Sequence, residues 1–119
     1  MYGLPKSFDP ASLLGRCLEQ ICINQNQLWL RFDAEVSICV ESAFLYKDHL
    51  SPERTEFNEI PVRYSGIMKL LGENVVRAVS DDNSTLTLGF GNGDVFQCFD
   101  NSKQYESYKI VLGDRTIVV

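Results

Sequence analysis

The chain is poor in the residues that several common functions require. It has eleven Lys and Arg against sixteen Asp and Glu, whereas a nucleic-acid or anionic-membrane binder needs clustered positive charge. It has one histidine, and its four cysteines form no Cys-x-x-Cys pair, so a zinc site is not indicated. Its apolar runs are far shorter than the about 20 residues that cross a bilayer. We therefore expect no nucleic acid, no membrane, no metal and no cofactor.

The beginning of the chain and its cysteines bear on the compartment. Residues 1–10 have no basic start followed by an apolar run, so we expect no signal peptide. Four cysteines without an export signal are expected to be reduced, packed thiols. The expected location is therefore the cytoplasm.

What the chain does contain is enough apolar material for one core. Of its 119 residues, 45% are hydrophobic, and seven Phe and five Tyr are among them. A chain of this length has room for one domain. We expect residues 1–119 to form a single domain.

Two stretches of the chain resemble each other. Residues 13–21 can be aligned with 70–78, residues 28–33 with 86–91, and residues 36–41 with 95–100. The offset grows by one residue at each turn, where insertions are tolerated. This similarity predicts two internal repeats, at about 9–42 and 65–100.

Each repeat is predicted to be a short helix followed by a three-stranded meander. Asp9 and Pro10 are typical of a helix start and Gly15 of a helix end, while apolar residues alternate at 28–32 and 86–90. Residues 43–64 form a connecting excursion that begins by extending the preceding strand, and 105–119 form C-terminal strands. We expect an α+β fold, mostly antiparallel β, in which the pseudo-repeats form one sandwich or half-open barrel.

No motif in the chain indicates catalysis. The glycines of 89–93 lie between strand residues on both sides, so they indicate a hairpin rather than a phosphate-binding loop. His49 lies in a segment rich in Pro and charge, which favours a solvated loop position, and no Gly-x-Ser-x-Gly elbow is present. We expect a protein that is not an enzyme.

Trp29 and Arg31 are the sharpest candidates for binding a partner. If Leu28 and Leu30 face the core, these two side chains point outward, and Trp and Arg are enriched in interface hot spots. The alternative is that residues 43–64 fold over this face and bury the indole. Tyr105 and Tyr108 carry the same ambiguity at the C-terminal edge.

Acidic residues outside the meanders form a second group of candidates. They are Glu41, Glu53, Glu56, Asp81 and Asp82. Such a group can steer and dock a basic protein partner, and its plain alternative is a solvated surface.

Short motifs spread over most of the chain carry a family resemblance. They lie at residues 14–16, 18–22, 30–33, 38–41, 105–110 and 117–119. On these motifs the chain resembles a family of small bacterial domains of unknown function. In size, acidity and β content such domains are similar to the immunity proteins of bacterial toxin systems. The resemblance implies no catalytic residue.

The expected function is therefore binding. The leading hypothesis is a cytoplasmic bacterial protein, immunity-like or antitoxin-like, that neutralises a basic toxin or effector by direct contact. One alternative is a protein that binds or sequesters a small molecule such as a signalling nucleotide. Another is a self-assembling structural module, for example a homodimer that pairs through residues 116–119.

Overall fold

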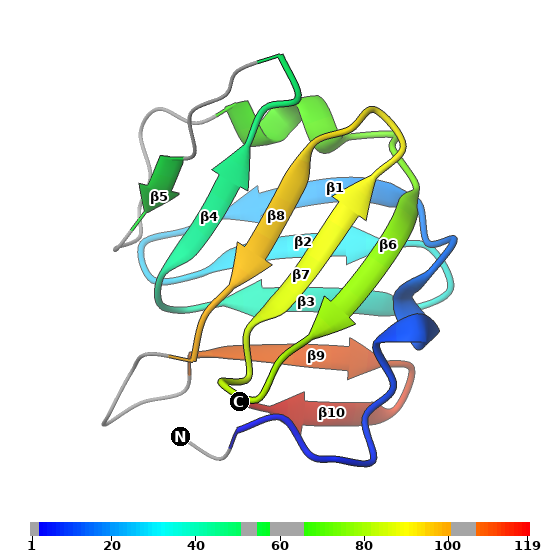
Figure 1. The fold of residues 1–119 in the computed structure, drawn as a ribbon, viewed down its shortest axis with the longest axis vertical. Helices are drawn as coiled ribbons and strands as arrows, with labels where there is room; N and C mark the ends of the chain where they lie inside the picture. The colour runs from blue at the N-terminus through cyan, green and yellow to red at the C-terminus, as the bar shows by residue number, and fades with distance from the viewer. Residues whose placement is uncertain (1–2, 51–54, 58–65, 101–106) are drawn as a thin grey trace.

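Two antiparallel sheets account for the structure of the protein (Figure 1). The computed structural model describes residues 3–50, 55–57, 66–100 and 107–119. The first sheet has the order β1-β2-β3-β9-β10 and the second the order β5-β4-β8-β7-β6. The strands are β1 (Leu18–Ile23), β2 (Leu28–Phe32), β3 (Val36–Val40), β4 (Phe44–Lys47), β5 (Thr55–Phe57), β6 (Val75–Ser80), β7 (Leu86–Phe90), β8 (Val95–Cys98), β9 (Tyr108–Leu112) and β10 (Arg115–Val118).

The core lies between the two sheets, whose strands cross one another in Figure 1. Alternate side chains of β2 and of β7 face it, as their sequence pattern predicts, and Phe32 stacks on Phe90 with ring centroids 6.5 Å apart. The central strand β3 is buried along its whole length. The outward residues of β3, Ser37 and Cys39, are thus buried as well.

The expected α+β class is wrong, because the helices are only single turns. The two helical segments, η1 (Pro10–Leu13) and η2 (Gly66–Leu70), are 3-10 turns of four and five residues. Asp9 does cap η1, by accepting a hydrogen bond from the Ala11 amide. However, these turns add no helical layer, and the molecule is mostly antiparallel β in two sheets.

The predicted architecture of two helix-plus-meander repeats is also wrong. Each sheet combines one meander with strands from elsewhere in the chain. The strands β9 and β10 complete the first sheet, and β4 and β5 complete the second. Because strand pairing over long sequence separations builds both layers, neither meander is a structural unit of its own.

Two backbone segments join the sheets at one corner of the sandwich. The Gly15 amide donates to the Val75 carbonyl and the Gly72 amide to the Leu18 carbonyl, both at 2.8 Å. The Val75 amide donates in turn to Arg16 O at 2.9 Å. This corner closes the start of β1 against the start of β6.

Residues 43–64 also differ from the prediction. The segment that was expected to lengthen β3 is the separate strand β4, which crosses to the second sheet and pairs with β8 and β5.

No helix among the described residues is long and apolar enough to cross a membrane.

Candidate functional site

The outer face of the first sheet carries Trp29. The pairing of the strands places Cys22, Trp29, Cys39 and Lys109 in one row across β1, β2, β3 and β9. Leu28 and the other alternate residues of β2 face the core, so the indole points outward. Within residues 43–64, β4 and β5 belong to the second sheet, and residues 51–54 and 58–64 lie outside the described part of the chain.

Three side chains hold the half-buried indole of Trp29 in place. The Arg31 guanidinium lies 4.7 Å and the Lys109 ammonium 5.2 Å from the ring centroid, within the range of cation–π attraction. The indole N–H donates a 3.1 Å hydrogen bond to Gln27 Oε1, and Gln27 in turn donates to Glu41. These contacts fix the orientation of the ring.

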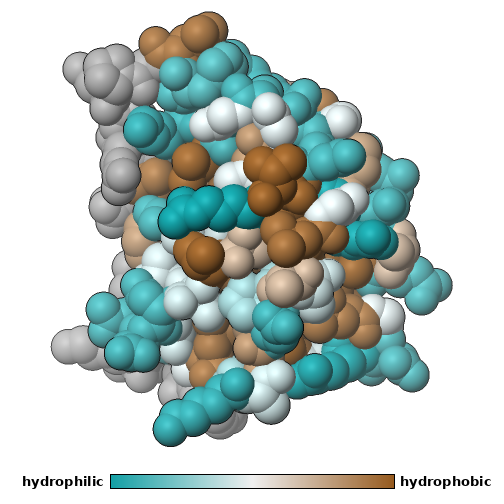
Figure 2. Space-filling view, turned by 45° about the vertical axis from the view of Figure 1, so that its right-hand side comes forward, coloured by the Kyte–Doolittle hydropathy of each residue, from teal (hydrophilic) through white to brown (hydrophobic). Residues whose placement is uncertain are grey.

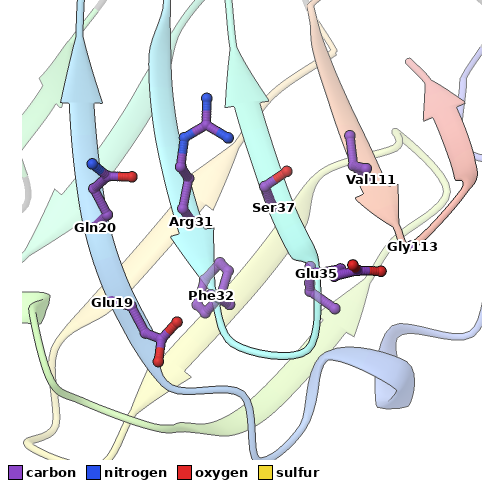
Figure 3. A pocket seen from close by; sticks show the side chains of 9 residues that line it. Glu19, Gln20, Arg31, Phe32, Glu35, Ser37, Val111 and Gly113 are labelled. Atoms are coloured by element: carbon purple, nitrogen blue, oxygen red, sulfur yellow. The ribbon is translucent and has the colours of Figure 1, made fainter.

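Beside Arg31 the same face is hollowed, with a volume of about 520 Å³. Glu19 and Glu35 lie on opposite sides of this hollow, with Phe32 between them (Figure 3). The Arg31 guanidinium is directed away from both carboxylates in this view. Among the described residues neither carboxylate has a cation as partner, and the charged side chains that line the hollow are these two carboxylates and the Arg31 guanidinium.

The structure brings together part of the predicted partner-binding set. Trp29, Arg31 and Glu41 share the outer face of the first sheet. Asp81 and Asp82 are exposed in the turn between β6 and β7, which belongs to the second sheet.

The remaining predicted site residues are dispersed. Glu56 lies in β5, at the edge of the second sheet, while Glu53 and Tyr105 lie outside the described residues. Tyr108 is fully buried in β9, and its hydroxyl donates a 2.6 Å hydrogen bond to Ser84 O. Burial also raises its pKa. In this fold Tyr108 is a core residue that offers no surface to a partner.

Sequence reasoning missed three members of the site, Lys109, Glu19 and Glu35. Lys109 reaches Trp29 only because β9 pairs with β3, and nothing local in the chain indicates that pairing. Glu19 lies within the strand irregularity between Leu18 and Gln20, where simple alternation does not give the direction of a side chain. A prediction of the sheet order would have found Lys109.

A second polar cluster surrounds the fully buried Asp94, just after the β7–β8 turn. Its carboxylate accepts hydrogen bonds from the Tyr46 hydroxyl at 2.7 Å, the backbone N–H of His49 at 2.8 Å and the side-chain amide of Asn92 at 3.2 Å. The His49 ring Nδ1 lies 2.6 Å from Asp94 Oδ1. Burial raises the pKa of Asp94, but these hydrogen bonds outweigh it and hold that pKa below its usual value. His49 is exposed in a turn, as expected, and is also tied to the buried Asp94.

The same cluster includes Asp48, and three such side chains invite comparison with a metal site. Two donors bound to one metal at about 2.1 Å in tetrahedral geometry lie more than about 3 Å apart, whereas His49 and Asp94 are at hydrogen-bonding distance. Lys69 pairs with Asp48 and lowers the pKa of that carboxyl. The cluster is therefore a hydrogen-bonded clamp between the end of β4 and the β7–β8 turn.

The Asp94–His49 pair also resembles part of a hydrolytic triad. Within the described part of the chain, no hydroxyl or thiol is bonded to the imidazole of His49. A nucleophile next to the base is what such chemistry requires.

The fold and the site together define a class: an antiparallel β-sandwich with a fixed aromatic side chain on one outer face. Comparison with protein-family models, curated proteins and solved structures gives no match to this chain. A function is therefore argued from the geometry of the site.

Proposed function

We propose that the protein is a non-enzymatic binding protein that docks a basic protein on the outer face of its first sheet. The observation that carries the proposal is the Trp29 indole, which Arg31 and Lys109 contact, beside a hollow lined by two carboxylates. An arginine or lysine side chain of the partner enters the hollow, and an apolar neighbour covers the indole.

The fixed indole favours tight binding. Tryptophan and arginine dominate the energetics of many interfaces, and ordering a flexible side chain on binding costs about 0.5–1.5 kcal/mol. Trp29 avoids most of this cost because Gln27, Arg31 and Lys109 already hold it. The partner then gains contact area without first ordering the ring.

Charge supports the choice of a basic partner. Glu19 and Glu35 outnumber Arg31 among the charged side chains that line the hollow, Glu41 lies near the indole beside Arg31 and Lys109, and the whole chain has a formal net charge of −5. Complementary potentials raise association rates and suppress wrong partners. The same two carboxylates repel phosphate, which disfavours the signalling-nucleotide alternative at this hollow.

The proposed biological role is that of an immunity-like protein in a bacterial cytoplasm. This part rests on the resemblance to small bacterial domains and on the acidic, β-rich character of the chain. In that role the sandwich covers a toxin or effector and blocks its active site or substrate channel.

Affinity capture followed by variant titration tests the proposal. The purified protein is immobilised, basic proteins from its source organism are captured at low salt, and each captured protein is purified and titrated by calorimetry. We expect Trp29→Ala to weaken binding at least tenfold, about 1.4 kcal/mol. Glu19→Gln with Glu35→Gln is expected to weaken it further and to flatten its salt dependence.

Asp9→Asn is a matched control, because Asp9 is an exposed carboxylate at η1, outside the hollow. It should leave the affinity unchanged. The proposal fails if no captured protein depends on Trp29, or if the hollow variants and the control bind equally well.

A further inference from the structure

Strand β6 forms one edge of the second sheet and has no partner strand on its outer side among the described residues, although η1 packs against it. It pairs with β7 on one side, and on the other side the only described backbone bonds are those of Val75 with Gly15 and Arg16. Val76 is 62% and Val79 39% exposed. Figure 2 brings the β6 side of the molecule forward and shows hydrophobic side chains gathered around hydrophilic ones. An open edge with exposed β-branched residues is a template for another strand.

The backbone groups that this edge offers follow from the pairing with β7. The Phe90 amide donates to Asp94 O, away from β6, and residues two apart in a strand direct their polar groups the same way. The backbone N–H and C=O of Leu88 therefore also point away from β6. The N–H and C=O of Ala78, which pairs with Leu88, accordingly point to the outer edge of β6. Ser80, two residues on, does the same.

The charges of the strand complement each other. Arg77 lies on the outer face over Gly89, where an added Cβ would lie 3.2 Å from the Arg77 Cβ, and it has no carboxylate partner among the described residues. Asp81 is exposed, and its Oδ1 accepts from the Asn83 and Thr85 amides without any described cation beside it. These opposite charges are four residues apart, with Val79 midway between them.

We propose that two copies of this chain associate through antiparallel pairing of their β6 strands, centred on Val79. In this register Val79 meets Val79 of the second copy, and Ala78 exchanges backbone hydrogen bonds with Ser80 of that copy. Arg77 lies opposite Asp81 of the second copy, and the two-fold axis repeats the pair. The second sheet then continues across the dimer.

The structure selects this register over its neighbour. A shift by two residues toward the start of β6 would bring Asp81 of the second copy opposite Val75, where Gly15 and Arg16 already bond. A shift by one residue would place outward-facing residues of one copy opposite inward-facing residues of the other. Cross-strand pairs of opposite charge and of β-branched residues stabilise the remaining arrangement. A second copy is the occupant because the strand carries its own complement.

Sedimentation velocity from micromolar to millimolar concentration tests the dimer. The wild-type protein is expected to move from the 13.5 kDa monomer toward twice that mass, with slower exchange of the Ala78 and Ser80 amide hydrogens. Val79→Lys places two like charges at the axis, and Arg77→Glu sets two acids against each other. Each variant is expected to raise the dissociation constant at least tenfold.

Lys47→Glu is the matched control, because Lys47 lies in the same row of the sheet but on β4. It should dimerise like the wild type, and Trp29→Ala should do so as well, since Trp29 lies on the other sheet. A monomer at every concentration overturns the proposal. So does a dimer that persists in both β6 variants, or that Trp29→Ala abolishes.

Discussion

At the scale of single residues, one buried carboxylate organises the polar interior. Asp94 is fully buried and accepts hydrogen bonds from Tyr46, His49 and Asn92. A buried charge is tolerated only when it is bonded in this way. The cost of losing that charge should therefore be visible in the stability of the protein.

Asp94→Asn is expected to lower the free energy of unfolding by about 1–3 kcal/mol, because charge-assisted hydrogen bonds are lost and buried donors lose their acceptor. Urea denaturation followed by Trp29 fluorescence measures the change. Asp82→Asn, an exposed aspartate in a turn, is the control and should stay within about 0.5 kcal/mol of the wild type. Equal stabilities of the two variants would contradict the role given to Asp94.

The contribution of ionised Asp94 to stability should also depend on pH in a predictable direction. The hydrogen bonds hold the pKa of Asp94 below its usual value in the folded state, whereas the unfolded chain has an Asp pKa of about 3.9. The stabilisation is thus complete above that pH and is lost as the pH falls through the folded value. The stability difference between wild type and Asp94→Asn should shrink on acidification below about pH 4. A difference that stays constant to pH 2 would contradict this.

At the scale of elements, the β7–β8 turn shows how a loop is fixed to the sheet. Gly93 has φ +96, and a Cβ there would lie 2.9 Å from the Cβ of His49. The turn therefore needs glycine for two reasons, its backbone conformation and the packing of His49 against it. The clamp around Asp94 depends on both.

Gly93→Ala tests this packing. It is expected to cost more than the about 1–2 kcal/mol of the left-handed conformation alone, and urea denaturation gives the value. Gly113→Ala is the matched control, because Gly113 has φ +63 with nothing within 4 Å of its Cβ position. If both variants lose the same stability, His49 does not pack as described.

Local patterns predicted some elements of this structure and misled about others. Strands β2 and β7 could be predicted because their alternation in sequence is the alternation of burial. The helices were expected because Asp9, Pro10 and Gly15 suit an α-helix and a 3-10 turn alike, whereas the two differ in their hydrogen bonds, which here join residues three apart. The crossing of β4 to the second sheet has no local signal, since its pairing with β8 spans about half of the chain.

At the scale of the whole molecule, the two proposed contacts fall on different sheets. The outward position of Trp29 followed from the alternation of β2, and that part of the site was predictable. Lys109, Glu19 and Glu35 joined it through long-range strand pairing and a strand irregularity. The proposed partner contacts the first sheet, and the proposed second copy contacts the edge of the second.

Acrylamide quenching of the fluorescence of Trp29, the single tryptophan, tests the docking face most directly. The measurement is made on the free protein and on its complex with the purified basic partner. If the partner covers the outer face of the first sheet, the quenching constant should fall several-fold in the complex and the emission should shift to the blue. An unchanged quenching constant in a saturated complex would contradict the account.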